Sequence, residues 1–80
     1  MYYLYGIKTG KAKQLVATFD SEQQLKSYVR WATLQQNADG SSKFEQGSPL
    51  VGYSRWEFAA EPQPEDDAAN VVHNPTPSML

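Results

Sequence analysis

The sequence predicts a small α+β protein in which a three-stranded, mainly antiparallel sheet carries one helix on one face, in the order β-β-α-β. Three observations support this fold class. Two strand-like runs are separated by a short turn, one stretch has a clear helical period, and a third strand-like run follows it. We expect one domain over residues 1–60, followed by an acidic, proline-containing tail over residues 61–80 that is disordered or loosely docked.

Residues 2–8 and 13–19 have the pattern of a hairpin joined by a glycine-containing turn. The first run is aromatic and aliphatic on both faces, which is typical of a central or doubly covered strand. In the second run, regular alternation places Leu15, Ala17 and Phe19 on one face, toward the expected core. The strand order stays open, although pairing of the third strand with the first would make the first strand central.

A helix is predicted over residues 20–36, and either Asp20 or Ser21 is suited to cap its N-terminus. Apolar residues at helical spacing then form one core-facing stripe: Leu25, Tyr28, Val29 and Ala32. Asn37 and Gly40 are suited to end the helix in a left-handed conformation. This amphipathic helix is the expected organiser of the core.

Trp31 and Leu34 do not belong to this stripe. At about 100° per residue, Leu34 lies half a turn away from Leu25, and Trp31 lies on the flank between them. Both side chains must therefore be covered or exposed. The sequence favours cover by residues 47–51 over a partner site, because so short a chain needs its apolar burial.

Residues 37–48 are polar and glycine-rich, which predicts a long loop. Phe44 is its expected anchor, and a short extra strand around residues 43–45 is an option. Residues 50–59 are predicted to form the third strand, with Trp56 on the face that packs against the helix.

The composition changes after the third strand. Residues 1–60 carry seven basic and five acidic side chains, whereas residues 61–80 carry four acidic and no basic side chains, so the two parts have formal charges of +2 and −4. The second part also holds four prolines and shows no periodicity. Apart from the terminal Met79 and Leu80, only Val71 and Val72 are candidates for docking, so we expect deletion of residues 62–80 to leave the melting temperature nearly unchanged.

The residue types indicate neither enzyme chemistry nor a metal site. The chain has no cysteine, which excludes disulfides, CxxC redox motifs and thiolate zinc sites. The single histidine, His73, lies in the predicted tail, and one imidazole cannot replace the three or four converging ligands of a metal site. We therefore expect no catalytic residues, no cofactor and no metal.

The start of the chain has no basic segment followed by an apolar core, and no apolar run approaches the roughly 18 residues of a membrane span. These features predict a soluble, cytoplasmic protein without a membrane partner.

The predicted sheet face away from the helix is a candidate partner surface, because tyrosine, tryptophan and arginine are enriched at interfaces. Together with the two helix residues outside the stripe, the candidate surface comprises Tyr3, Tyr5, Tyr53, Arg55, Trp31 and Leu34. We expect a non-enzymatic protein-interaction module that binds a protein partner or self-associates as a homodimer. The alternative is weak binding of single-stranded nucleic acid, whose bases would stack on the tyrosines. The small charge excess counts against nucleic acid as a partner.

Overall fold

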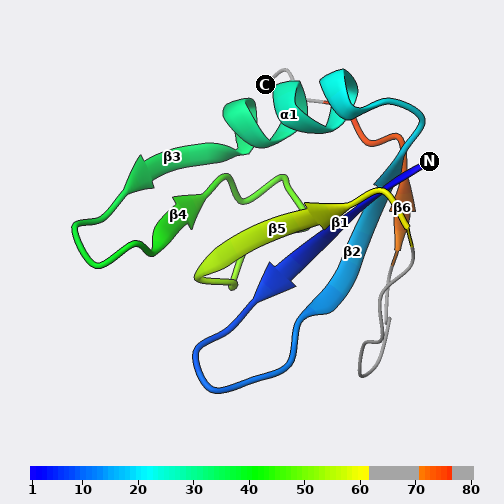
Figure 1. Cartoon of the computed structure of the whole chain (residues 1–80). Coiled ribbons are helices and arrows are strands. Elements are labelled where there is room, and N and C mark those ends of the chain that lie inside the picture. The colour runs from blue at the N-terminus through cyan, green and yellow to red at the C-terminus, as the bar shows by residue number, and fades with distance from the viewer. Residues whose placement is uncertain (62–70, 77–80) are drawn as a thin grey trace.

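A computed structural model describes residues 1–61 and 71–76 (Figure 1). Within these residues the chain forms one helix and six strands, in the order β1 (Tyr2–Ile7), β2 (Gln14–Phe19), α1 (Glu22–Ala32), β3 (Thr33–Gln36), β4 (Ser42–Phe44), β5 (Arg55–Ala59) and β6 (Val72–His73). Four strands form a sheet in the order β5-β1-β2-β6, and β3 pairs with β4 in a separate hairpin. The α+β class is confirmed, but the sheet under α1 has four strands where three were predicted.

The first strand is central, as its apolar faces indicated. β1 pairs antiparallel with β2 on one side and with β5 on the other. The turn between β1 and β2 is closed by a hydrogen bond from the Lys11 N–H to the Lys8 carbonyl, at 3.0 Å. This arrangement places β5 at one edge of the sheet.

A β-bulge at Val16 changes the side-chain pattern of β2. Leu4 of β1 opposes Ala17, but the next residue of β1, Tyr5, opposes Leu15, so that Val16 is the extra residue. The prediction of regular alternation is therefore wrong here. Val16 is buried in the core under α1, whereas Leu15 lies opposite Tyr5 and is not part of the core.

The helix begins as predicted but ends earlier. The Ser21 side chain caps it by accepting a hydrogen bond from the Gln24 N–H, at 3.1 Å. At the other end, the Thr33 hydroxyl donates to the Val29 carbonyl at 2.8 Å, and the Thr33 N–H bonds to the same carbonyl. Thr33 has extended backbone angles, so residues 33–36 leave the helix and form β3.

The β3–β4 hairpin takes the place of the last predicted helical turn. The Asn37 N–H donates to the Ser41 carbonyl at 2.7 Å, and the Gly40 N–H donates to the Asn37 carbonyl at 3.1 Å. Gly40 has a φ of 90°, a conformation that glycine adopts without strain. The predicted helix stop is thus a hairpin turn. Phe44 at the end of β4 is buried, as expected of an anchor, whereas Leu34 on β3 is 54% exposed.

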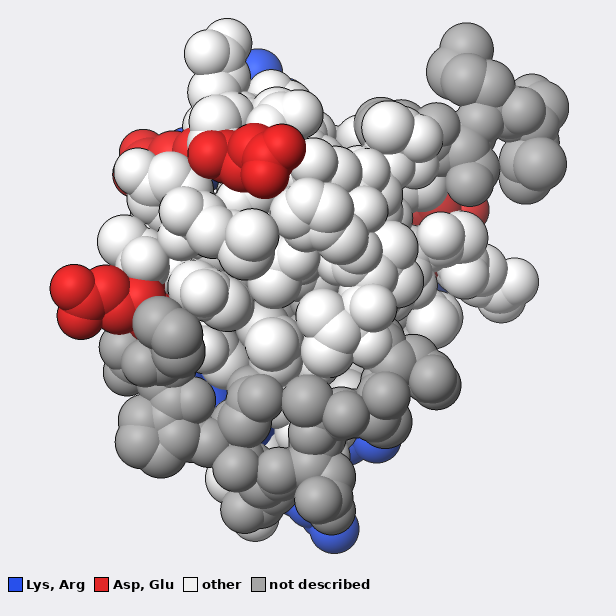
Figure 2. All heavy atoms as spheres, turned by 90° about the vertical axis from the view of Figure 1, so that its right-hand side faces the viewer, with Lys and Arg blue, Asp and Glu red and all other residues white. Residues whose placement is uncertain are grey.

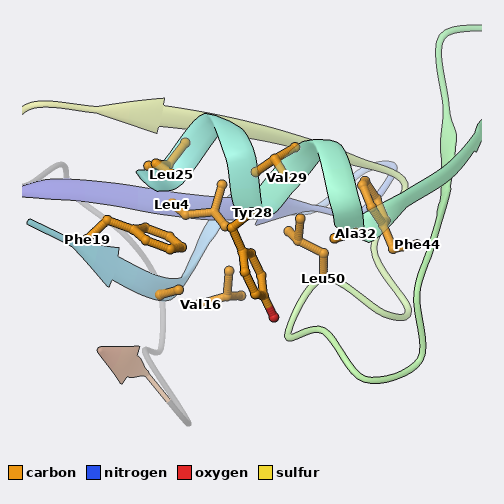
Figure 3. Packing of buried hydrophobic residues seen from close by; sticks show 10 residues of the cluster. Leu4, Val16, Phe19, Leu25, Tyr28, Val29, Ala32, Phe44 and Leu50 are labelled. Carbon is orange, nitrogen blue, oxygen red and sulfur yellow. The ribbon is translucent and has the colours of Figure 1, made fainter. Parts of the chain in front are cut away.

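The core lies between α1 and the sheet (Figure 3). It consists of ten buried side chains: Leu4, Val16, Ala17, Phe19, Leu25, Tyr28, Val29, Ala32, Phe44 and Leu50. All four residues of the predicted helical stripe belong to it. Leu50 enters from the loop between β4 and β5 and lies near Ala32 and Phe44 (Figure 3). The segment expected to cover the outer side of the helix therefore fills the core instead.

The fourth strand comes from the segment predicted to be a disordered or loosely docked tail. Val72 and His73 pair in parallel with Ala17 and Thr18 of β2. The Asn74 N–H donates to the Thr18 carbonyl at 2.7 Å, which extends this pairing. Viewed from the β6 side, most described atoms belong to uncharged residues, and the charged side chains lie mainly around the rim of this face (Figure 2).

Replacing Gly6 with alanine is expected to lower the free energy of unfolding by about 1–3 kcal/mol. A Cβ atom at this position would lie 2.5 Å from Cγ of Tyr53, whose ring rests on the strand. The ring cannot easily move, because the Tyr53 hydroxyl donates to Oε1 of Gln14 at 2.7 Å. Urea unfolding followed by tryptophan fluorescence would measure the loss. The same substitution in a Tyr53→Ala background should have a much smaller effect, and an equal loss in both backgrounds would contradict the clash.

Candidate functional site

The fold does not assemble the predicted tyrosine and arginine face. Tyr5 is only 1% exposed. Nζ of Lys13, the residue before β2, lies 5.0 Å from the centroid of the Tyr5 ring and 2.6 Å from Oε1 of Glu57 on β5, so an ion pair lies beside this ring. Tyr3 points to the same side of the sheet and is half-buried. The Tyr5 ring is therefore not available for stacking on a partner.

The remaining predicted residues lie on different parts of the molecule. Tyr53 packs on the helix side of the sheet, against the core. Arg55 reaches the β3–β4 turn, where its Nη2 donates to the Asp39 carbonyl at 2.9 Å. Trp31 is half-buried against the core, and Leu34 is exposed on β3. These side chains do not form one continuous surface.

A different feature combines charge with an open surface. A groove of about 580 Å³ runs between α1, the β3–β4 hairpin and β5. Three cationic side chains line it, namely Lys26 and Arg30 from α1 and Arg55 from β5, and Trp56 contributes an indole ring. No Asp or Glu of the described residues belongs to its walls. Clustered charge of one sign in a concave surface concentrates ligands of the opposite sign.

The three cations differ in how strongly the protein already engages them. Lys26 pairs with Glu22 at 2.8 Å. Arg55 uses Nη2 for the Asp39 carbonyl, which leaves most of its five N–H donors for other partners. The Arg30 side chain has no ion pair or hydrogen bond with any other residue in the described part of the chain. Arg30 is therefore the cation most available to a ligand.

The turn beside Arg55 is stabilised around Asp39. The Ser41 hydroxyl and the Ser41 N–H donate to the Asp39 carboxylate at 2.7 and 3.0 Å. These hydrogen bonds, with a smaller contribution from the charge of Arg55, lower the pKa of Asp39 below its usual value. Asp39 is thus ionised at neutral pH and partly offsets the charge of Arg55, as Glu22 offsets that of Lys26, so Arg30 is the cation of the groove without a counter-charge among the described residues.

The groove runs beside the free edge of β5. In the described part of the sheet, β1 is the only strand next to β5. The β3–β4 hairpin contacts the residue before β5, because the Ser42 N–H donates a hydrogen bond to the Ser54 carbonyl at 2.7 Å. Trp56 and Phe58 stack on the helix side of β5, with ring centroids 6.2 Å apart, and both are half-buried. An edge strand of this kind can pair with a strand from another chain.

Among the described residues, no group of three or more His, Cys, Asp or Glu side chains is placed to hold a metal ion. No helix in residues 1–61 and 71–76 is long and apolar enough to cross a membrane. Comparison with known proteins finds no matching family model, no similar curated protein and no similar solved structure. The chemistry of the groove therefore carries the functional argument.

Sequence reasoning missed Lys26, Arg30 and Trp56 as surface residues. The first two are four residues apart on a helix, and like charges at this spacing weaken an isolated helix by a few tenths of a kcal/mol. That pair marks a basic flank of the helix in the sequence, although Lys26 also pairs with Glu22 on the same helix. No local pattern links it to Arg55, which reaches the groove only through the strand order.

Proposed function

We propose that this protein is a non-enzymatic interaction module that binds an extended, acidic segment of a partner protein beside β5. One observation carries the proposal. The groove that holds three cations and no described carboxylate in its walls opens beside the free edge of a sheet. Backbone pairing and charge complementarity therefore favour the same kind of ligand at the same place.

Each part of the groove would contribute a different interaction. The outer edge of β5 offers backbone N–H and C=O groups to an added strand. Arg30 and Arg55 can each hold a carboxylate through two parallel N–H donors, which a lysine cannot do. The half-exposed indole of Trp56 offers an apolar contact between the charged groups. An alternation of acidic and apolar residues would match this arrangement, because alternate side chains of a strand face the same side.

Single-stranded nucleic acid is the competing occupant of a basic groove. Such ligands gain much of their affinity by stacking bases on successive aromatic rings. The burial of Tyr5 and the placement of Tyr53 on the other side of the sheet support the peptide instead, because they remove the predicted stacking face. The excess of only two positive charges in residues 1–60 argues in the same direction.

Binding of a blocked hexapeptide that alternates Glu and Val is the direct test, measured by NMR titration of the labelled protein at low salt. We expect the largest amide shifts in β5 and beside Arg30. Arg30→Gln and Arg55→Gln should each raise the dissociation constant about 3- to 10-fold, because each removes a charge-assisted pair. Added salt should weaken binding in the unmodified protein.

Lys43→Gln is the matched control, since Lys43 is an exposed cation on β4 that does not line the groove. Lys43→Gln should leave the affinity for the peptide unchanged. In a second control, replacing every Glu of the peptide by Gln should abolish the difference in affinity between the variants. An equal effect of all three charge changes would show unspecific attraction. If the protein binds an oligonucleotide more tightly than the peptide, and Arg30→Gln weakens that binding, the groove is a nucleic-acid site and the peptide proposal is wrong.

A second copy of the chain is one source of such a segment, because residues 61–67 contain four carboxylates. Sedimentation equilibrium separates the two sources. A protein that dimerises in a manner sensitive to Arg30→Gln uses the groove for itself, whereas a monomer that binds the acidic peptide requires a foreign partner.

A further inference from the structure

Tyr28 is a buried tyrosine whose hydroxyl has no partner among the residues that the structure describes. The residue is 3% exposed, and its ring lies between the rings of Phe19 and Trp31, at centroid distances of 5.6 and 5.4 Å. From α1 the side chain extends past Val16 and Leu50, with the hydroxyl at its far end (Figure 3). Among residues 1–61 and 71–76, this oxygen makes no hydrogen bond. Buried polar groups normally have a partner, so an unpaired phenol indicates a missing one.

Tyr28 lines a second hollow, separate from the basic groove. This cavity has a volume of about 490 Å³ and lies between β2, residues 47–49 and residues 72–76. Its size falls within the range of pockets that take small organic molecules. Burial also raises the pKa of the Tyr28 hydroxyl, which keeps it protonated and able to donate a hydrogen bond.

The walls of this cavity are apolar with a few hydrogen-bonding groups. Leu15, Val16, Pro49, Val72 and Pro75 supply the apolar surface. Gln14 also lines the cavity, and its Oε1 already accepts the hydrogen bond from Tyr53, which leaves its amide N–H groups as donors. No Asp, Glu, Lys, Arg or His of the described chain lines the cavity. An ion would therefore lose its hydration here without gaining a counter-charge.

We propose that this cavity binds a neutral, mainly apolar small molecule whose carbonyl-type oxygen accepts a hydrogen bond from the Tyr28 hydroxyl. The two nearby donors, Tyr28 and Gln14, both require an acceptor on the ligand. The uncharged walls select a ketone, ester or amide over a carboxylate. This site does not depend on the acidic ligand proposed for the groove, and residues 72–76 complete it by docking beside β2.

The proposal is tested with two probes of nearly equal shape, 2-acetylnaphthalene and 2-ethylnaphthalene, titrated into the protein and followed by NMR. We expect the ketone to bind about five-fold or more tightly than the hydrocarbon, which is the typical net value of one hydrogen bond. Tyr28→Phe keeps the ring and removes the oxygen. It should abolish the preference for the ketone while leaving the affinity of the hydrocarbon unchanged.

Val72→Glu is a second variant that places a charge in the wall of the cavity. Val72 is 41% exposed, so the substitution should leave the fold intact and weaken both probes about ten-fold or more. Arg30→Gln should change neither probe, although it is expected to weaken the acidic peptide. The proposal is overturned if neither probe binds, if the protein does not distinguish them, or if Tyr28→Phe weakens both equally.

Discussion

Replacing Leu25 with alanine is expected to lower the free energy of unfolding by about 2–5 kcal/mol. Leu25 is fully buried in the core between α1 and the sheet (Figure 3). The substitution removes its contacts and leaves a cavity that the surrounding side chains can fill only in part. Domains of this kind are stable by only about 5–15 kcal/mol, so one such change removes a large fraction of the total.

Urea unfolding followed by tryptophan fluorescence measures this loss. Ser27→Ala is the control, because Ser27 is exposed on the same helix and its replacement should change the free energy of unfolding by less than about 0.5 kcal/mol. Val29→Ala should also destabilise the protein, since Val29 is 3% exposed. A loss below about 1 kcal/mol for Leu25→Ala would show that α1 does not organise the core.

Ending the chain after residue 61 is expected to lower the free energy of unfolding by about 2 kcal/mol, and the melting temperature by roughly 10 °C. The sequence alone predicted almost no effect. The structure changes this expectation, because β6 pairs with β2. In addition, the side chains of His73 and Asn74 form hydrogen bonds with Thr18 and Asp20. Nδ1 of His73 lies 2.7 Å from the Thr18 hydroxyl, and the Asn74 side chain both accepts from the Asp20 N–H at 3.0 Å and donates to its carboxylate at 2.8 Å.

A point substitution distinguishes the effect of docking residues 72–74 on β2 from the effect of chain length alone. Asn74→Gly keeps the positive φ of 50° accessible but removes both side-chain hydrogen bonds to Asp20, so it should reproduce part of the loss. Calorimetry of the three proteins gives the comparison. If the shortened chain melts within about 2 °C of the full chain, the pairing of β6 contributes nothing to stability.

The parts of the fold that sequence reasoning predicted well depend on interactions between near neighbours. The N-terminus of α1 follows from a cap and its hydrogen bond three residues later. The buried stripe of α1 follows from the 3.6-residue period, and all four of its members are buried. Both signals are contained within about one or two turns of helix.

The parts that failed depend on pairing with distant segments. Residues 33–36 have enough helical pattern to extend α1, but β3 gains its hydrogen bonds from β4. The bulge at Val16, set by the register of β2 with β1, puts Val16 in the core in place of Leu15, while Ala17 and Phe19 stay on the predicted face. Leu34 was predicted to lie on the helix, half a turn away from Leu25, but it belongs to β3, where it is exposed.

The candidate sites show the same division. Tyr5 is beside an ion pair between Lys13 and Glu57, residues 44 positions apart, so its burial was not visible in the sequence. Lys26 and Arg30 share a helix flank that the sequence does reveal, but Arg55 joins them only because β5 lies at the sheet edge next to the hairpin. The cavity at Tyr28 is lined by β2, residues 47–49, Tyr53 and residues 72–76, which are far apart in the sequence.

The sequence by itself determined the α+β class, the two strands of the first hairpin, the start of α1 and the residues that α1 buries. Capping, turn chemistry and side-chain periodicity act over a few residues, so they can be read along the chain. Tertiary structure alone decided the end of α1, the register of β2, the docking of β6, and the positions of the groove and the cavity. These features arise from hydrogen bonds and packing between segments far apart in sequence, whose energies exceed the local preferences they override.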